Sequence, residues 1–299
     1  MEPEKKYGFH PPVLRLDVHC HLGKHGAGIP VKERMELDRL LGIDHCVILP
    51  SPVQDGTNIL HGCMGSEEAR KTAEKYPEHF SWFVNAEPDG TDAVRKKLTS
   101  AKEAGAKGVG EFGTKLRFDD AWVDELLEIC GELGLPFLFH ISPYGTGPYG
   151  VIDEKGLPGL ESALKKHPGT VFIGHSQPFW YELGRYDPDL PEPALNGFPF
   201  CKVGQEGRAV ELLRTYDNLY ADLSAVSGLN AILRDQDYGV RFLTEFSSRL
   251  LYGTDLTGTD FIFPLGQVLD YYLLSGRISE AVYRKICREN AASLLGIPL

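Results

Sequence analysis

Short apolar segments rich in β-branched and aromatic residues recur along the chain, and each precedes turn residues and a segment with helical periodicity. Eight of them predict β-strands, at 14–21, 45–51, 80–88, 106–113, 136–141, 170–176, 219–225 and 249–256. The intervening helical patterns include residues 31–42, 66–77, 121–134 and 159–169, and two more follow the last strand, at 264–276 and 279–296. Strands that alternate with helices indicate βαβ units and therefore a parallel sheet.

Eight such units favour an α/β fold of the (β/α)8 TIM-barrel type, with one domain over residues 1–299. A doubly wound sheet is the rival fold, but it would gather its site at a single switch point, whereas polar residues here end many strands. Three connections are long, at 51–66, 142–158 and 177–204. Each follows a strand, so we expect all three on the carboxyl face, where barrel enzymes build their sites.

The composition of the chain argues against two classes of binding partner. The net charge is −11 and no basic stripe is present, which argues against nucleic-acid and membrane-surface partners. The N-terminus lacks the apolar core of a secretory signal, and no apolar run approaches 18 residues. Six scattered cysteines without close pairing are typical of a reduced, cytoplasmic protein. We expect a small-molecule substrate, and the sequence leaves a homo-oligomer open.

Candidate metal ligands begin in the first strand. Asp17, His19 and His21 alternate along it, and strand side chains alternate between two faces, so we expect all three to point the same way. If that direction is into the barrel, two imidazoles reach one point near its carboxyl end, with Asp17 deeper inside. A lone His-x-His pair, however, fits two ordinary buried histidines equally well.

Other strand ends strengthen the metal interpretation. His140 and His175 are second to last in the fifth and sixth strands, and Asp255 closes the eighth. Glu111 lies on the fourth strand, where we expect it to point with Val109, as a ligand, a bridge between two metals or a partner of a ligand histidine. Buried imidazoles and carboxylates that converge without a partner would be costly, and a divalent cation supplies that partner.

The motifs DVHCH, GVGEFG, LFHI, FIGHS and YGTD, followed by ENAASLLG, resemble the amidohydrolase superfamily in their order. More narrowly, they are similar to its metal-dependent hydrolase branch, which includes aminocarboxymuconate-semialdehyde and resorcylate-type decarboxylases. The resemblance runs from about residue 14 to 297. It implies that His19, His21, His140 and Asp255 bind the metal, that Asp255 also takes a proton from the activated water, and that His175 is a ligand or an acid/base group.

The resemblance leaves the metal and the reaction open. Zinc is the first expectation and manganese the second. Glu111 stands where two-metal members carry a carbamylated lysine, which favours one metal. Hydrolysis through an activated water is the leading reaction, decarboxylation by a lyase is the alternative, and a barrel that binds metal or ligand without turnover is a third hypothesis.

Candidate substrate contacts come from loop positions on the carboxyl face. Trp180, Tyr144 and Arg185 are the main candidates, with Phe179 and Phe261 as further aromatic lining. Arg117 and Arg234 are additional candidate cations for a carboxylate substrate, and His25 and His61 lie in loops of the same face.

Overall fold

The computed structural model describes residues 11–24, 28–51, 62–88, 90–185, 197–259 and 263–298. The loop residues His25, His61 and Phe261, named above as candidate contacts, lie outside the described residues. Among the described residues, no helix combines the length and the apolar character that crossing a membrane requires.

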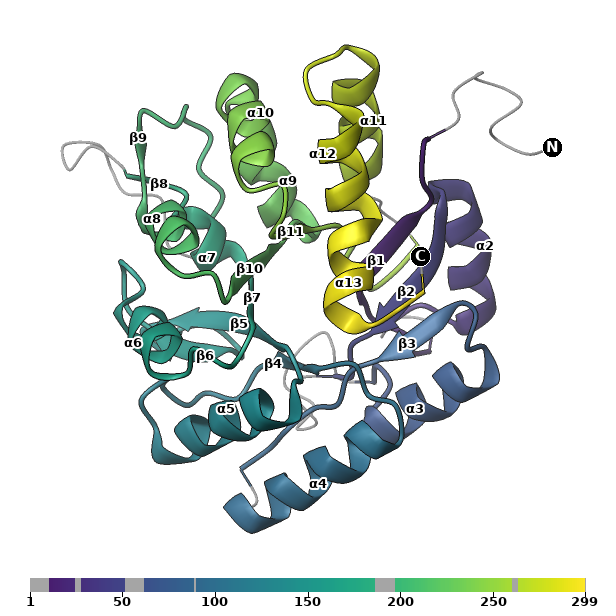
Figure 1. Cartoon of the computed structure of the whole chain (residues 1–299), viewed down its shortest axis with the longest axis vertical. Helices are drawn as coiled ribbons and strands as arrows, with labels where there is room; N and C mark the ends of the chain where they lie inside the picture. The colour runs from purple at the N-terminus through teal and green to yellow at the C-terminus, as the bar shows by residue number, and fades with distance from the viewer. Residues whose placement is uncertain are drawn as a thin grey trace.

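All eight predicted strands are present, and each overlaps its predicted range (Figure 1). They are β1 (Arg15–Cys20), β2 (Ile43–Ile48), β3 (Phe80–Trp82), β4 (Val109–Phe112), β5 (Phe137–Pro143), β7 (Phe172–His175), β10 (Leu219–Asp222) and β11 (Leu250–Leu251). Two short strands lie in the long connections, β6 (Val151–Asp153) and β8 (Gly184–Arg185), and a third, β9 (Gln205–Glu206), follows directly after the last of them.

The eight main strands are parallel and form two sheets, in the orders β1-β2-β3 and β11-β10-β7-β5-β4. A parallel bridge between Val84 and Val109 joins the sheets on one side, and a bridge between Cys20 and Leu256 joins them on the other. The backbone N–H of Asp255 also donates to the carbonyl of His19 at 2.8 Å. These links confirm the predicted (β/α)8 barrel.

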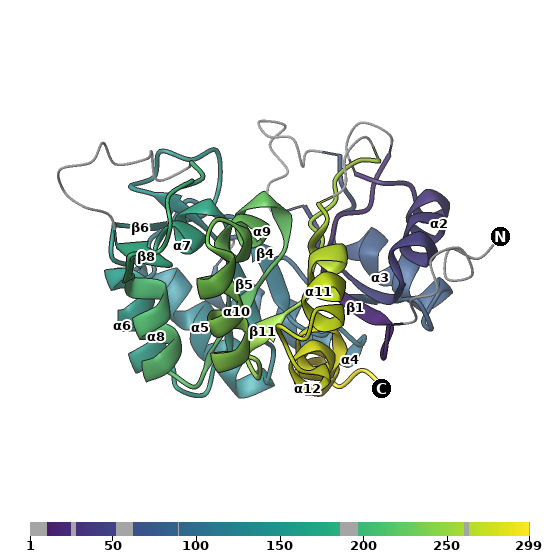
Figure 2. The ribbon, with the colours of Figure 1, turned by 90° about the horizontal axis from the view of Figure 1, so that it is seen from above.

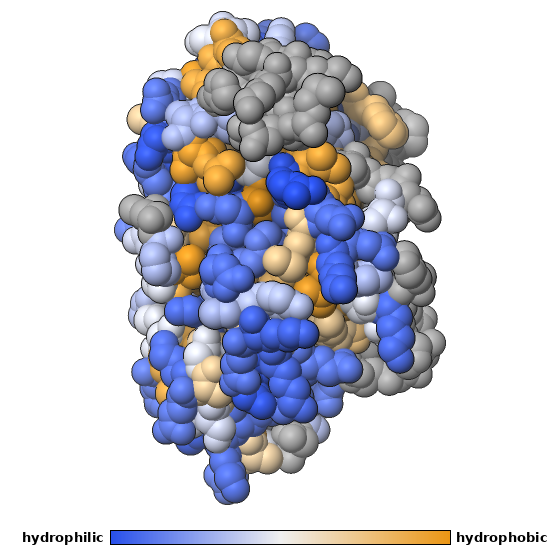
Figure 3. All heavy atoms as spheres, turned by 90° about the vertical axis from the view of Figure 1, so that its right-hand side faces the viewer, coloured by the Kyte–Doolittle hydropathy of each residue, from blue (hydrophilic) through white to orange (hydrophobic). Residues whose placement is uncertain are grey.

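Helices form a layer around the strands, as Figures 1 and 2 show. They are α2 (Val31–Leu41), α3 (Ser66–Lys75), α4 (Thr91–Glu103), α5 (Ala121–Leu133), α6 (Pro158–Lys166), α7 (Gln177–Tyr181), α8 (Arg208–Thr215), α9 (Ala225–Leu233), α10 (Gln236–Glu245) and α11 (Leu265–Leu274). The last predicted helix contains three consecutive segments: α12 (Glu280–Arg284), the π-helical η1 (Lys285–Glu289) and α13 (Asn290–Leu295). The outer face that carries α2 is mostly hydrophilic (Figure 3).

Two apolar layers hold the barrel together. The larger one packs the strands against the surrounding helices. The smaller one fills the barrel interior and includes Leu16, Val18, Val47, Leu49, Phe83, Leu138, Ile173 and Leu251, with Ala291, Ala292 and Leu295 of α13 packed on it. Because this interior layer is apolar, the polar side chains inside the barrel gather beyond it, toward the carboxyl ends of the strands.

Candidate metal centre

A β-bulge in β1 changes the direction of its polar side chains. Asp17 pairs with Cys46 of β2, and the next pair joins Cys20 to Ile48, so three residue steps on β1 match two on β2. The extra residue interrupts the two-residue alternation of the strand and turns the residues that follow it.

As a result Asp17 points away from the two histidines, toward helix α2. There it binds Arg34 and accepts hydrogen bonds from the backbone N–H and the hydroxyl of Thr254. His19 and His21 point into the barrel mouth. The prediction that all three side chains share one direction is wrong, because the bulge separates them.

A second bulge lies in β4. Val109 pairs with Phe137 and Phe112 pairs with Phe139, so β4 again carries one residue more than its neighbour. Val109 packs in the outer apolar layer, whereas Glu111 lies among the imidazoles. The expectation that Glu111 points with Val109 is therefore also wrong, and the bulge is the reason.

Two glycines allow the backbones to approach closely around the site. Gly110 has a φ of +143°, and a Cβ there would lie 2.6 Å from the carbonyl oxygen of Leu138. A Cβ at Gly253 would lie 2.6 Å from Asp222 Oδ1 and 3.1 Å from the Cβ of His19. A side chain at either position would displace strands that carry polar residues of the site.

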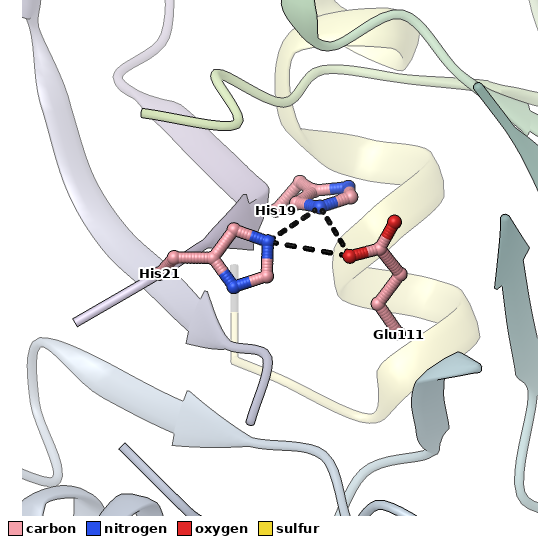
Figure 4. A group of neighbouring side chains, drawn as sticks. All are labelled: His19, His21 and Glu111. Atoms are coloured by element: carbon pink, nitrogen blue, oxygen red, sulfur yellow. Dashed lines mark hydrogen bonds and ion pairs between the residues drawn. The ribbon is translucent and has the colours of Figure 1, made fainter. Parts of the chain in front are cut away.

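Four of the predicted ligands converge on one point. The Nε2 atoms of His19 and His21 lie 3.1 Å apart, and each lies 3.4 Å from Asp255 Oδ1. Glu111 Oε2 lies 3.5 Å from His21 Nε2 and 3.9 Å from His19 Nε2. Figure 4 shows the two imidazoles and the Glu111 carboxylate pointing toward one another.

The other two predicted ligands lie beside the same carboxylates. His140 Nδ1 is 2.8 Å from Glu111 Oε1, and His175 Nε2 is 3.8 Å from that oxygen. His175 Nε2 also lies 3.7 Å from Asp255 Oδ2. The structure therefore brings all six residues together at the carboxyl ends of the strands.

Three of the imidazoles have a hydrogen-bond acceptor next to Nδ1, the ring nitrogen that faces away from the centre of the site. His19 Nδ1 lies 2.6 Å from Asp222 Oδ2, and His21 Nδ1 lies 3.2 Å from the carbonyl oxygen of Leu49. His175 Nδ1 lies 3.3 Å from Asp222 Oδ2 and 3.2 Å from the hydroxyl of Ser224. When these Nδ1 atoms donate, each Nε2 is left with a lone pair that faces the centre, as metal-binding histidines require.

The charges of the site depend on one another. Burial by itself raises the pKa of a carboxyl group and lowers that of an imidazole. Against burial, His140 and neighbouring imidazoles hold the pKa of Glu111 well below its ordinary value, and His19 and His175 do the same for Asp222. Asp222 in turn outweighs burial and raises the pKa of His175 to about 9. The metal-free site thus keeps its carboxylates ionised and holds protons that a cation can replace.

The donor set fits a divalent cation on two grounds. Among the described residues, Glu111 Oε2 is buried and accepts no hydrogen bond, although a buried carboxylate oxygen without a partner is costly. Metal–ligand bonds of 2.0–2.2 Å place tetrahedral ligand atoms about 3.4 Å apart. The spacings of 3.1–3.9 Å among His19, His21, Asp255 and Glu111 bracket that value.

Asp222 is expected to control metal affinity although it faces the back of the imidazoles. Replacement of Asp222 by asparagine should weaken metal binding by about 10–100-fold, because His19 and His175 lose the negatively charged acceptor that orients them and raises their basicity. Isothermal titration with Zn²⁺ measures this effect, and the exposed Asp217→Asn is the matched control. Unchanged affinity in the Asp222 variant would show that this carboxylate does not position the ligands.

The pKa of His175 predicts how the stability of the metal-free protein depends on pH. Because the folded-state pKa of about 9 exceeds the ordinary value of 6.5, the stabilisation is complete below pH 6.5 and disappears as pH rises through 9. The free energy of unfolding should fall by roughly 3 kcal/mol over this window. Urea unfolding of chelator-treated protein at pH 6.5, 8 and 9.5 tests this, and His175→Gln should flatten the profile. A wild-type profile that is flat or rises would contradict it.

Two residues around the site were not predicted. Asp222 is the last residue of β10, in the segment LYAD, and its position at a strand's carboxyl end was the available signal. Tyr149 comes from the loop between β5 and β6, and its ring centroid lies 4.3 Å from that of His140. Burial and the carboxylates of Glu111 and Asp255 raise the pKa of Tyr149 well above its ordinary value. Loop sequence alone does not reveal such a position.

The main candidate substrate contacts differ in exposure and in the partners that hold them. Trp180 is 3% exposed, packs on Phe242 and donates its indole N–H to the carbonyl of Asp222, so it supports the strand end and does not line an open pocket. Tyr144 is 56% exposed, with its hydroxyl accepting from the backbone N–H of Lys155.

Arg185 is exposed and pairs with Glu211. Phe179 is completely buried in the outer apolar layer. These positions follow from short elements in the loops, α7 and β8, which the sequence pattern did not predict.

Comparison with protein families identifies the class of protein. A family model described as Amidohydrolase matches residues 66–297, so the chain belongs to the amidohydrolase family. The superfamily resemblance inferred from the motifs is confirmed. His19 and His21 lie before the matched range, and it is the fold that brings them to the other ligands. A search of curated proteins found no significant match.

Solved structures of other proteins share the fold of this chain. A 2,6-dihydroxybenzoate decarboxylase from Rhizobium is 15% identical, with coverage of 95% of this chain and 99% of the other and a TM-score of 0.57. A Polaromonas dihydroxybenzoic acid decarboxylase with bound manganese is 17% identical, with coverage of 95% and 97% and a TM-score of 0.58. A Pseudomonas putida protein provisionally named as a 2-pyrone-4,6-dicarboxylic acid hydrolase is 17% identical, with coverage of 97% of this chain and 100% of the other and a TM-score of 0.59. At these identities the likeness establishes the fold alone.

Proposed function

We propose that the chain is a metal-dependent hydrolase that acts on a small ester, lactone or amide. One observation carries the proposal: four imidazoles and two carboxylates, from five separate strands or strand ends, meet at the carboxyl mouth of the barrel. The orphaned oxygen of Glu111 in the same cluster indicates a missing positive partner. The family assignment supports metal-dependent catalysis on a small molecule.

His19, His21 and Asp255 would hold the cation, together with Glu111. A divalent cation, when bound, lowers the pKa of water from 15.7 to about 7 and polarises a substrate carbonyl. Burial by itself would raise the pKa of Asp255, but the surrounding imidazoles lower it by more, so that the pKa lies below its ordinary value. The carboxylate therefore stays ionised and can act as a base. Asp255 accepts the proton of the attacking water and delivers it to the leaving group.

His175 is the second candidate acid/base group and lies beside Asp255, with its Nε2 3.7 Å from Asp255 Oδ2. Its Nδ1 is fixed by Asp222 and Ser224, so Nε2 faces the reaction centre, where it binds a cation or donates a proton to the substrate. Tyr149, over the ring of His140, would form part of the wall that separates this centre from water.

Decarboxylation is the second candidate, because two of the similar structures are named as aromatic-acid decarboxylases. A carboxylate substrate would favour a free cation beside the centre. Arg185 and Arg117 are exposed and pair with Glu211 and Glu154, so neither of these two candidates is a free cation. For this reason hydrolysis stays the first candidate.

A substrate screen tests the proposal. Zn²⁺- and Mn²⁺-loaded protein is incubated with panels of esters, lactones, amides and aromatic acids, with chelator-treated protein as control. We expect metal-dependent hydrolysis, detected as proton release for esters and lactones and as free amine for amides. Carbon dioxide release without hydrolysis would support the decarboxylase instead, and no turnover by a protein with full metal content would favour a barrel that only binds metal or ligand.

A further inference from the structure

We propose that Asp17 is a positioning residue, which fixes His19 and Asp255 relative to each other from behind the strands that carry them. The inference rests on the metal dependence proposed above, but it concerns a buried network outside the barrel mouth. The network contains the carboxylate of Asp17, the two strand ends that this carboxylate joins, and Arg34 of helix α2.

The seam at which the two sheets of the barrel meet passes between His19 and Asp255. β1 and β11 belong to different sheets. The backbone joins them through the bridge between Cys20 and Leu256 and through the N–H of Asp255, which donates to the carbonyl of His19. A candidate metal ligand therefore lies on each side of the seam. A cation that binds both ligands requires the two strand ends to keep a fixed separation, because metal–ligand bond lengths vary little.

The carboxylate of Asp17 joins both sides of the seam through backbone hydrogen bonds. Its Oδ1 accepts the N–H of His19 and the N–H of Thr254, each at 2.9 Å. Thr254 directly precedes Asp255, so these N–H groups belong to one ligand and to the neighbour of the other. Its Oδ2 accepts the hydroxyl of Thr254 and the guanidinium of Arg34. One carboxylate thus sets the separation of two ligand-bearing backbones.

Arg34 holds this carboxylate in place. Its guanidinium is completely buried and binds Asp17, the hydroxyl of Thr254, and Asp38 one turn further along α2. Asp38 in turn lies 2.8 Å from Nε2 of His79. Hydrogen bonds between ionised groups are shorter and stronger than neutral ones, so the Asp17 side chain has little freedom to turn.

The β-bulge in β1 gives Asp17 this position. In a regular strand Asp17 would face the same way as His19 and His21. The extra residue turns Asp17 outward, where it reaches Thr254 and α2, while both histidines stay in the mouth of the barrel. Bulges next to active sites often re-aim a side chain in this manner. The bulge is therefore the feature that separates the positioning residue from the ligands.

A second ion pair on the same strand offers a matched comparison. Arg15, two residues before Asp17, is buried and binds Asp270 of α11. Asp270 also accepts the hydroxyl of Tyr283 at 2.7 Å. These two partners of Asp270 are neither candidate metal ligands nor sequence neighbours of one. Loss of the charge at Asp270 should therefore lower stability without changing the geometry of a bound metal.

Co²⁺ binding separates a positioning role from a purely structural one. Metal-free full-length protein is titrated with Co²⁺ in the presence of a competing chelator, and the visible absorption of the bound ion reports its coordination geometry. We expect Asp17→Asn to weaken Co²⁺ binding by about tenfold and to change the absorption spectrum. Asp270→Asn should keep the wild-type affinity and spectrum. Urea unfolding of each metal-free variant measures its stability separately.

Two substitutions at Thr254 test the same contact with less disturbance of charge. Thr254→Val loses only the hydroxyl that binds Asp17, and we expect it to weaken Co²⁺ binding and change the spectrum as Asp17→Asn does. Thr254→Ser keeps the hydroxyl and should show the wild-type affinity and spectrum. This pair decides the question alone where Asp17→Asn does not fold.

The outcomes also separate this inference from the proposed function. Wild-type affinity and spectrum in both Asp17→Asn and Thr254→Val would overturn the positioning role and leave the metal-dependent hydrolase intact. An equal loss of affinity in Asp270→Asn would overturn it as well, because general destabilisation would then explain the effect. No bound Co²⁺ in folded wild-type protein would overturn both proposals.

Discussion

Asparagine in place of Asp255 is expected to lower turnover by about 10²–10⁴-fold for any substrate that the screen identifies. Asp255 lies beside His19, His21 and His175, where its carboxylate is the one positioned to exchange a proton with water. Asparagine keeps an oxygen ligand but cannot act as a base. It also tolerates the left-handed φ of 54° at this position, so the substitution introduces little backbone strain.

The readout is kcat, measured on protein whose metal content has been determined for each sample. Asp119→Asn, at an exposed position after β4, is the control and should retain wild-type turnover. An Asp255→Asn protein with full metal content and more than about a tenth of wild-type kcat would show that another group accepts the proton.

Alanine in place of Arg34 should reduce the free energy of unfolding by about 3–5 kcal/mol. The Arg34 guanidinium is completely buried and binds Asp17 of β1 and Asp38 of its own helix, with a further hydrogen bond to the hydroxyl of Thr254. Removal of the cation leaves the buried carboxylates of Asp17 and Asp38 without their guanidinium partner, and only Asp38 keeps another contact of this kind, with His79. Such loss of one member of a buried pair is strongly destabilising.

Urea unfolding of metal-free protein at pH 7 measures this change. The exposed Arg39→Ala, on the same helix, is the matched control and should change stability by less than about 0.5 kcal/mol. A similar small change in Arg34→Ala would mean that water or a rearranged side chain compensates for the lost cation. Because Thr254 precedes Asp255, a loss of metal affinity in Arg34→Ala would further show that this network supports the site.

The fold was predictable because local pattern and global architecture agree. Each strand is an apolar segment followed by turn residues and a helix, and parallel strands place all their carboxyl ends at one face. That rule was sufficient to bring His19, His140, His175 and Asp255 together from positions more than 200 residues apart.

Side-chain direction was less predictable, because strict alternation assumes regular strands. One extra residue in β1 turns Asp17 to α2, and one in β4 turns Glu111 away from Val109 and into the site. Bulges depend on the register with neighbouring strands, which a single sequence does not contain. Asp222 was overlooked because one carboxylate at a strand end has no distinctive spacing. The burial of Trp180 depends on the packing of α7, a helix of five residues.

Anomalous diffraction from Mn²⁺-loaded crystals tests whether the carboxyl mouth of the barrel binds a metal. We expect an anomalous peak about 2.2 Å from the Nε2 atoms of both His19 and His21, with an oxygen of Asp255 at a similar distance. An ordered barrel mouth with full manganese in the medium and no peak would contradict it. A peak confined to the other cluster of potential ligands, Asp38, Cys46 and His79, would contradict it as well.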